Sequence, residues 1–317
     1  MTGCAICLGK LSDGETFHVR CVAALFGTQH LPRLDVSPER LSELGVEMIT
    51  VGHGSISGTQ PKVLVDLSPD EDKLEIAIGR SGPFILKPQT RNYRHLPENE
   101  HLSMRLAERA GVLIPPCGIL PLIGGELAYV VQRFDRRRGS PSKLRQEDFC
   151  QLTGQLAHDK YQGSAEQCVK VIRKYSTSPD EDVHRLFRLL FVAYLSGNGD
   201  LHLKNFSLFT DEANRVSLTP AYDLVCTALL LPNDQLALPI HGKKDRIKWK
   251  TWLEFAAYCN ISEAVAVQIR SEVLVAMTEH ASPLLAASAL PVDEQARYLK
   301  ILELRMASLA ISDDQST

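Results

Sequence analysis

The stretch NGDLHLKNF, Asn198 to Phe206, determines how the rest of the chain is interpreted. It places Asp200 five residues before Asn205, and the downstream segment AYDL, Ala221 to Leu224, supplies a second carboxylate at Asp223. Transfer of a phosphoryl group to a hydroxyl needs one acid to accept the hydroxyl proton, and an Asn and an Asp to hold magnesium. An Asp and an Asn five residues apart occur by chance in many proteins, so this spacing indicates a site for phosphoryl transfer only together with the segments upstream.

Upstream segments supply the other groups that such a site needs. Lys87 ends the apolar strand FILK, where its ammonium could reach phosphate oxygens, although a solvated strand-end lysine is the simpler interpretation of this residue alone. The small-residue segment GHGSISG, residues 52–58, offers backbone N–H groups that could cover phosphates. In this loop we expect the nucleotide contacts to come from Ser55, Ile56, Ser57 and Gly58.

The segment VVQRFD, residues 130–135, is expected to join a strand-rich lobe to a helical lobe. Backbone groups at such a junction can bond an adenine edge, and Asp135 could reach ribose hydroxyls. A plain edge strand that ends in a charged turn fits the segment equally well. His202, between Asp200 and Asn205, is expected to order the loop or approach a phosphate. A helix-capping Asp200 and a turn Asn205 form the structural alternative, which we disfavour because the other groups appear in the order of a kinase.

Composition describes an ordinary globular chain. Its 317 residues are 44% hydrophobic and 23% charged, with a net charge of −3 that gives no electrostatic reason to expect direct nucleic-acid binding. The N-terminus lacks a basic segment followed by an apolar run, and the apolar segment Leu186 to Leu195 is too short to span a bilayer. We therefore expect no membrane association and a cytoplasmic protein.

The pattern of strands and helices predicts an α+β fold with two lobes, as in protein kinases. Residues 1–50 form a short preface, 51–135 a strand-rich N-lobe and 136–317 a helical C-lobe. The expected strands cover residues 62–66, 74–78, 84–87, 117–122, 127–131 and 216–218. The expected helices cover residues 38–44, 97–110, 146–156, 164–175, 182–196, 249–258, 262–280 and 292–307.

Four residues of the preface have the spacing of metal ligands. The pair Cys4-x-x-Cys7 and the pair His18-x-x-Cys21 match a four-ligand zinc knuckle, which would pin a segment with little apolar sequence of its own. Reduced thiols in a small hairpin, with His18 incidental, are the alternative, and a disulfide suits a reducing cytosol poorly. The other five cysteines lie in apolar segments and are expected to be small buried residues.

Several segments, in the same order along the chain, resemble the HipA-like kinases of bacterial toxin–antitoxin modules. They are SISGTQPK (55–62), FILKP (84–88), LPENE (96–100), QRFDR (132–136), QEDF (146–149), KY (160–161), DLHLKNF (200–206) and TPAYD (219–223). The family's longer members carry roughly a hundred residues before the serine-rich loop, whereas this chain carries about fifty. It is therefore similar to the short HipT branch, whose two loop serines are autophosphorylation sites.

The resemblance implies an ATP- and Mg²⁺-dependent serine/threonine kinase with a role for each motif residue. Asp200 would be the catalytic base, Lys87 an ATP ligand, and Asn205 and Asp223 magnesium ligands. The nucleotide cleft would be lined by Gln132, Phe134 and Asp135. Ser55 and Ser57 would be regulatory phosphorylation sites, and residues 89–97 would correspond to the family's activation loop.

The resemblance also implies partners. These are a small HipS-like protein, a HipB-like DNA-binding antitoxin and a protein substrate, expected to be an aminoacyl-tRNA synthetase. Two other functions remain compatible with the residues. One is a weakly active ATP-binding protein whose main role is complex formation with an antitoxin repressor, and the other is a kinase for a small molecule.

Overall fold

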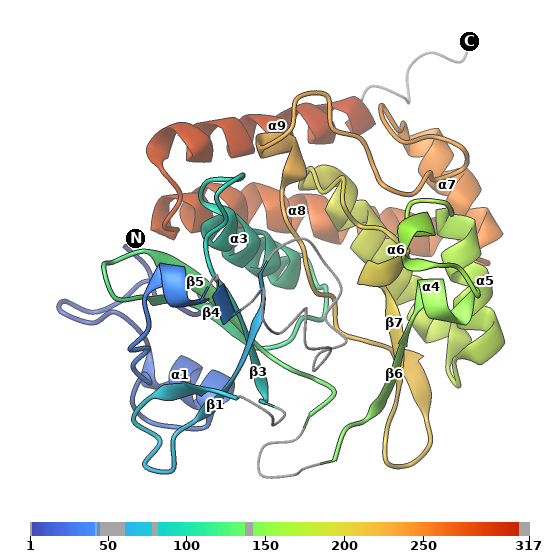
Figure 1. Cartoon of the computed structure of the whole chain (residues 1–317). Coiled ribbons are helices and arrows are strands. Elements are labelled where there is room, and N and C mark those ends of the chain that lie inside the picture. The colour runs from blue at the N-terminus through green and yellow to red at the C-terminus, as the bar shows by residue number, and fades with distance from the viewer. Residues whose placement is uncertain (1, 42, 45–60, 78–81, 137–141, 311–317) are drawn as a thin grey trace. The chain divides into compact units, whose positions relative to one another are not determined.

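The chain divides into two compact units in the computed structural model, which describes residues 2–41, 43–44, 61–77, 82–136 and 142–310. The strand-rich unit consists of Met1–Arg105, Pro115–Lys143 and Leu284–Leu290. The helical unit consists of Leu106–Ile114, Leu144–Pro283 and Pro291–Thr317. Helices α3 (Leu96–Arg109) and α8 (Glu263–Ala287) contribute residues to both units (Figure 1). The expected phosphate loop, with Ser55, Ile56, Ser57 and Gly58, lies outside the described residues.

An antiparallel sheet of five strands, in the order β2-β1-β3-β5-β4, forms the strand-rich unit. Its strands are β1 (Val63–Leu67), β2 (Leu74–Ile76), β3 (Phe84–Lys87), β4 (Cys117–Pro121) and β5 (Leu127–Gln132). Strand β3 is central, and its pairing with β5 sets Phe84 opposite Gln132 and Lys87 opposite Tyr129. These five strands were expected from the sequence and are confirmed. Lys87 is the last residue of the central strand β3, which holds it in place.

The N-terminal residues share the apolar core of this sheet. Helix α1 (Val19–Phe26), which was not expected, ends at Gly27, whose φ of 72° suits a glycine C-cap. It buries Val22, Leu25 and Phe26, and the ring of Phe26 lies 5.3 Å from that of Phe84 on β3. The short helix expected after Ser37 is confirmed for residues 38–41 and 43–44, and its N-terminus is capped by the Ser37 hydroxyl, 3.3 Å from the amide of Arg40.

The helical unit is built around an aromatic core between two helices. Its helices are α4 (Phe149–Leu152), α5 (Ala165–Tyr175), α6 (Pro179–Leu195), α7 (Trp249–Tyr258) and α9 (Val292–Ala310), with most of α8. Phe187 and Phe191 of α6 contact Trp252 of α7, with ring centroids 5.7 and 4.9 Å apart. Such buried aromatic pairs contribute both area and edge-to-face contacts. The core therefore fixes α6, whose C-terminus leads into the loop with Asp200.

One expected helix is wrong in part. Residues 146–156 were expected to be helical, but Arg145–Asp148 form strand β6, and only Phe149–Leu152 are helical. Strand β6 pairs with β7 (Ser207–Thr210), which was not expected, and β7 pairs with the expected β8 (Val216–Leu218). The side chain of Asp148 accepts a hydrogen bond from the Gln151 amide, and this capping box starts the helix later than its apolar pattern indicated.

Among the residues that the structure describes, no helix combines the length and the apolar character that a membrane crossing requires.

Candidate functional site

Asp200 lies on a tight loop directly after helix α6. The helix ends at Leu195, and Gly197 adopts a φ of 76°, which turns the chain away from the helix axis. The side-chain oxygen of Asn198 accepts the backbone N–H of Asp200 at 3.0 Å, so this loop is held by its own polar residues. The carboxylate of Asp200 is half exposed and accepts a hydrogen bond of 2.5 Å from the hydroxyl of Tyr161. An accessible carboxylate on a fixed loop suits a general base.

Asn205 is held against the same loop. Its side-chain Nδ2 donates to the backbone carbonyl of Asp200 at 3.0 Å, and its own amide donates to the carbonyl of His202 at 2.8 Å. The residue is 7% exposed and closes a 3₁₀ turn, Leu203–Asn205. Because Nδ2 is used within the loop, the amide oxygen Oδ1 is the atom that Asn205 offers to a cation.

His202 is buried between these two residues. Its ring contacts the Tyr161 ring edge-on at 5.1 Å, and its Nε2 lies 4.0 Å from a carboxylate oxygen of Asp200. Burial lowers the pKa of His202 from 6.5 to about 4, although the carboxylates of Asp200 and Asp223 act in the opposite direction. The imidazole is therefore neutral near pH 7. Its Nδ1 is buried and has no hydrogen-bond partner among the described residues.

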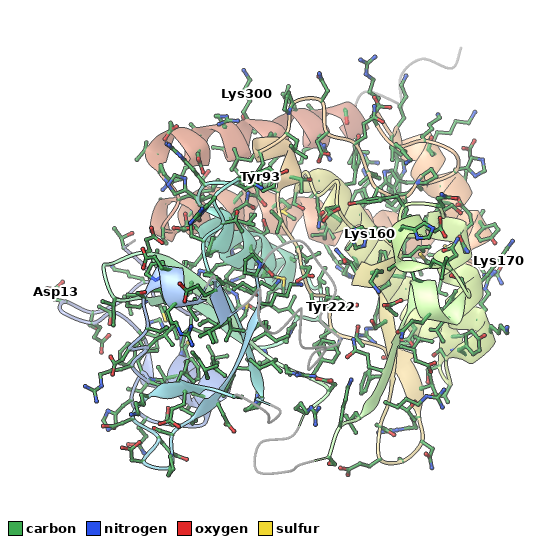
Figure 2. All side chains as sticks on the ribbon, viewed as in Figure 1. Asp13, Tyr93, Lys160, Lys170, Tyr222 and Lys300 are labelled. Atoms are coloured by element: carbon green, nitrogen blue, oxygen red, sulfur yellow. The ribbon has the colours of Figure 1, made fainter. Side chains whose placement is uncertain are left out.

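The segment with Asp223 is tied to the same loop. The hydroxyl of Tyr222, a residue labelled in Figure 2, donates to the backbone carbonyl of Lys204 at 3.0 Å and lies 2.6 Å from the hydroxyl of Ser207. Asp223 itself has a φ of 56°, a left-handed conformation that costs energy for a residue other than glycine. A strained backbone at a candidate metal ligand supports a functional role for this carboxylate.

Lys204, in contrast, is engaged by another residue. Its ammonium contacts the carboxylate of Asp148 at 2.6 Å, and both side chains are mostly buried. Asp148 is also the N-cap of α4. The positive charge of Lys204 is therefore neutralised within the helical unit, and the residue connects the loop to the β6–α4 junction.

Lys87 forms a buried ion pair that the sequence analysis missed. Its Nζ lies 2.5 Å from Oε1 of Glu100 on helix α3, and the two side chains are 4% and 1% exposed. In protein kinases a strand lysine must pair with a helix glutamate before the lysine can hold ATP phosphates. The signal was available, because Glu100 is an acidic residue on the first helix after the lysine strand. The pair excludes the simple interpretation of Lys87 as a solvated strand-end lysine.

The polar groups at the end of β5 and directly after it form more hydrogen bonds within the protein than expected. The amide of Gln132 donates to the carbonyl of Pro116 at 2.9 Å, and the amide of Arg133 donates to that of Pro83 at 2.8 Å. Burial favours the neutral acid of Asp135, but the bidentate Arg133, at 2.9 and 2.8 Å, and Lys143 hold its pKa below the ordinary value. Asp135 is therefore an ionised partner of Arg133. The nucleotide contacts of Gln132, Phe134 and Asp135 stay a prediction.

The four expected metal ligands of the N-terminus lie together. One ligand atom each from Cys4, Cys7, His18 and Cys21 falls within 4.8 Å of all the others. All eight cysteines are free thiols.

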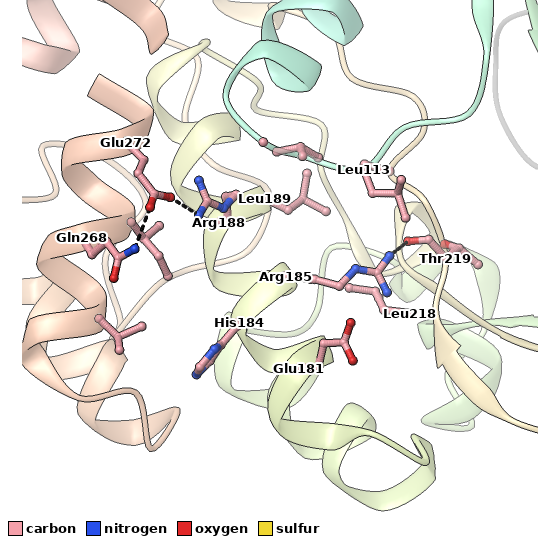
Figure 3. Close-up of a pocket in the computed structure, with 15 residues that line it drawn as sticks. Leu113, Glu181, His184, Arg185, Arg188, Leu189, Leu218, Thr219, Gln268 and Glu272 are labelled. Carbon is pink, nitrogen blue, oxygen red and sulfur yellow. Dashed lines mark hydrogen bonds and ion pairs between the residues drawn. The ribbon is translucent and has the colours of Figure 1, made fainter. Parts of the chain in front are cut away.

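A pocket of about 580 Å³ opens elsewhere in the helical unit, between α6, α8 and residues 111–113 (Figure 3). Its two arginines have protein partners. Arg188 contacts Glu272 at 2.5 Å, and Arg185 contacts Asp182 at 2.8 Å and the carbonyl of Thr219 at 3.1 Å. Because these cations are used by the fold, we assign them a structural role.

The loop of the helical unit fits a magnesium–nucleotide ligand. Mg²⁺ prefers oxygen ligands, and the unit offers Oδ1 of Asn205 and the carboxylate of Asp223. Two buried polar atoms of the same loop, Nδ1 of His202 and Nδ2 of Asn198, have no hydrogen-bond partner among the described residues. Buried polar groups are normally satisfied, so such atoms favour a bound polar ligand.

Comparison with known proteins is consistent with this chemistry. The family model of the HipA-like C-terminal domain matches residues 54–281. A putative kinase of Haemophilus influenzae is 33% identical over 208 residues, which cover 60% of this chain and 59% of the relative. The serine/threonine-protein kinase toxin HipA of Shewanella oneidensis is 30% identical over 211 residues, which cover 60% and 47%. The chain thus spans about half the length of the curated relatives it matches.

Two solved structures share the fold. HipA of Shewanella oneidensis, solved with HipB and its operator DNA, matches with a TM-score of 0.67 at 22% identity, covering 95% of this chain and 80% of that chain. The Helicobacter pylori proinflammatory kinase CtkA matches with a TM-score of 0.53 at 10% identity, covering 78% and 94%. The expected α+β, protein-kinase-like fold is confirmed.

Proposed function

Because the chain belongs to the family of the HipA-like C-terminal domain, we propose that it is an ATP- and magnesium-dependent serine/threonine protein kinase. The observation that carries this proposal is the loop of the helical unit, where Asp200, Asn205 and His202 are held together by short hydrogen bonds and burial. The buried pair of Lys87 and Glu100 in the strand-rich unit supports it independently.

Each residue has a defined task in this proposal. Asp200 accepts the proton of the substrate hydroxyl, and Tyr161 holds its carboxylate in place. Asn205 and Asp223 hold Mg²⁺, and Lys87 contacts phosphate oxygens, oriented by Glu100. Neutral His202 orders the loop and offers its Nδ1 to a polar group of the nucleotide. Bound Mg-ATP supplies the phosphoryl group and the charge that neutralises its oxygens.

The first test is incubation of the purified chain with Mg-ATP, followed by intact mass measurement and phosphopeptide mapping. We expect phosphate on the protein, and none in an Asp200→Ala variant treated in the same way. Phosphate in neither sample, with ATP still bound, would overturn the kinase proposal and favour an ATP-binding protein that acts through complex formation.

We also propose that phosphorylation of the serine-rich loop regulates the kinase. Phosphate on Ser55 or Ser57 would add about −1.5 to −2 charges at residues assigned to ATP phosphates, and the repulsion would weaken nucleotide binding. Ser55→Asp and Ser57→Asp should therefore lower ATP affinity in a titration, while the Ser→Ala variants still phosphorylate an external substrate. Equal titration curves for the Asp variants and the parent would contradict this regulation.

The biological setting is proposed from the relatives. One structural neighbour is a HipA toxin solved with HipB and operator DNA, which supports a HipB-like antitoxin as partner here. We further propose the short HipT branch, a HipS-like small protein, an aminoacyl-tRNA synthetase as substrate, and action in the cytoplasm, where free cysteines are expected. Induction of the chain in a bacterium should arrest growth, and Asp200→Asn should not. Equal growth of both strains would contradict the role as toxin.

A further inference from the structure

We propose that Cys4, Cys7, His18 and Cys21 bind one structural zinc ion, and that the resulting zinc knuckle holds helix α3 in place. Both halves concern the folded strand-rich unit and do not depend on kinase activity. The two halves rest on different observations. The first rests on the geometry of the four side chains, and the second on the contacts of the residues between Cys4 and Cys7.

Two separations between the ligand atoms fit a zinc ion, and the other ligand atoms lie within 4.8 Å of one another. A tetrahedral site with Zn–S near 2.3 Å and Zn–N near 2.05 Å requires about 3.6 Å between sulfur and nitrogen. The Nδ1 of His18 lies 3.4 Å from the sulfur of Cys7 and 3.7 Å from that of Cys21. A histidine nitrogen among three sulfurs also argues against a disulfide, which would use two of the cysteines and leave His18 without a role.

The surroundings prepare three of the four ligands for a metal. The Nε2 of His18 lies 2.8 Å from the backbone carbonyl of Lys10, so Nε2 carries the proton and Nδ1 presents its lone pair to the sulfurs. Two backbone amides point at sulfur, that of Gly9 at Cys7 and that of His18 at Cys4, each at 3.4 Å. Such N–H groups favour thiolates, the form of cysteine that binds metal.

The turn that carries Cys4 and Cys7 allows the sulfur of Cys7 to come close to the ring of His18. Leu8 has a φ of 56°, and a Cβ at Gly9 would lie only 3.2 Å from the sulfur of Cys7 and 3.3 Å from the ring of His18. The turn is closed by hydrogen bonds from the amide of Cys4 to the carbonyl of Gly9 and from the amide of Leu8 to that of Cys4. This glycine therefore permits the close contact between Cys7 and His18.

The residues between the two cysteines contact the rest of the strand-rich unit. The carbonyl of Ala5 accepts the amide of Ile119 on β4 at 2.9 Å, and the carbonyl of Ile6 accepts Nε2 of buried His101 on α3 at 2.8 Å. His101 directly follows Glu100, the partner of Lys87. A zinc ion that fixes Cys4 and Cys7 thus fixes the carbonyl of Ile6, and through His101 the helix that carries Glu100.

Metal analysis tests the first half. The protein is purified without added metal, and its zinc is measured by mass spectrometry. We expect about one zinc per chain in the parent and in the control Cys259→Ala. The zinc content should fall at least tenfold in Cys7→Ser and in Cys21→Ser. Cobalt substitution should produce the visible bands of a tetrahedral thiolate site. Wild-type protein with only traces of zinc and no cobalt bands would overturn the site, even where the serine variants fail to fold.

Hydrogen exchange tests the second half. Removal of zinc with a chelator should raise amide exchange in α3 at least tenfold and leave α7 unchanged. His101→Leu should keep its zinc and show the α3 exchange of the zinc-free protein, because it removes only the bond to Ile6. Unchanged amide exchange in α3 after zinc loss would overturn the proposal that the zinc knuckle holds this helix in place. None of these measurements uses phosphorylation, so an inactive protein can still confirm or refute the zinc knuckle.

Discussion

Tyr161 determines how the carboxylate of Asp200 is presented. Its hydroxyl donates the 2.5 Å hydrogen bond that holds a half-exposed side chain in one orientation. Hydrogen bonds to charged groups contribute about 1.5–3 kcal/mol, which corresponds to a factor of about ten or more in rate if the orientation is needed in the transition state. If Asp200 is the proposed base, Tyr161 is therefore expected to act as a positioning residue.

We expect Tyr161→Phe to lower the phosphorylation rate by about tenfold and to leave the Kd for ATP unchanged. Tyr175→Phe is the matched control, because the hydroxyl of Tyr175 contacts the backbone carbonyl of Leu152, at 3.5 Å, instead of a carboxylate. The measurement is a single-turnover assay with a separate ATP titration. Equal rates in Tyr161→Phe and the parent would show that Asp200 does not need this hydrogen bond.

The ion pair of Lys87 and Glu100 makes a second prediction at the scale of residues. Both side chains are almost completely buried, so Glu100→Ala takes from the buried ammonium of Lys87 the carboxylate that it contacts at 2.5 Å. Glu100→Ala should lower the free energy of unfolding by about 3–5 kcal/mol in urea denaturation. Glu43→Ala, which breaks the exposed pair with Arg40, should change it by less than about 1 kcal/mol. A loss below about 1 kcal/mol in Glu100→Ala would contradict a buried, ionised pair.

At the scale of elements, the junction of β6 and α4 shows why the helix expected over residues 146–156 was wrong in part. The carboxylate of Asp148 starts α4 as its N-cap and also contacts Lys204 from the loop that carries Asp200. Residues 145–148 pair with β7, whose residues follow that loop directly. Sheet pairing between distant segments therefore overrides the local preference and connects α4 to the loop.

His101 on helix α3 makes the stability of the folded chain depend on pH. His101 is fully buried, and burial together with Arg105 lowers its pKa from 6.5 to about 3, while its bond to Ile6 acts in the opposite direction. Between these two values the unfolded chain binds a proton that the folded chain does not. Stability from this residue is therefore complete above pH 6.5, and acidification lowers it by up to about 1.4 kcal/mol per pH unit.

His101→Gln can keep the donor to Ile6 but cannot titrate. We expect the unfolding free energy of this variant to fall less steeply than that of the parent as the pH is lowered from 7.5 to 5.0. The difference between the two slopes should correspond to up to one proton bound on unfolding. Parallel slopes for His101→Gln and the parent would contradict a neutral, buried His101.

At the scale of the whole molecule, ligand binding and stability are linked. A ligand that binds only the folded chain stabilises it by about 2.7 kcal/mol at a hundredfold excess over its Kd. Mg-ATP should therefore raise the Tm of the parent, and Asp223→Ala should lose most of this shift, since it removes a proposed magnesium ligand. Asp293→Ala, at an exposed position of α9, should keep it. Equal shifts in thermal scans of Asp223→Ala and the parent would contradict the proposed metal site.

Local patterns were sufficient for most elements and for part of the site. The apolar alternation of β3, the caps around α5 and the periodicity of α7 are short-range signals, so these elements were predicted to within one residue. The spacing of Asp200, Asn205 and Asp223 is equally local, and so is the spacing of the four proposed zinc ligands. Their chemistry could therefore be inferred from the sequence.

The sequence by itself determined which residues are chemically able to act and, through their order, the family of the fold. The tertiary structure decided which of them are paired. It placed Glu100 against Lys87, Tyr161 against Asp200, and Asp148 against Lys204. These partners lie 13, 39 and 56 positions apart. No short-range signal specifies such contacts, because they depend on how helices and strands far apart in the chain bury their side chains together.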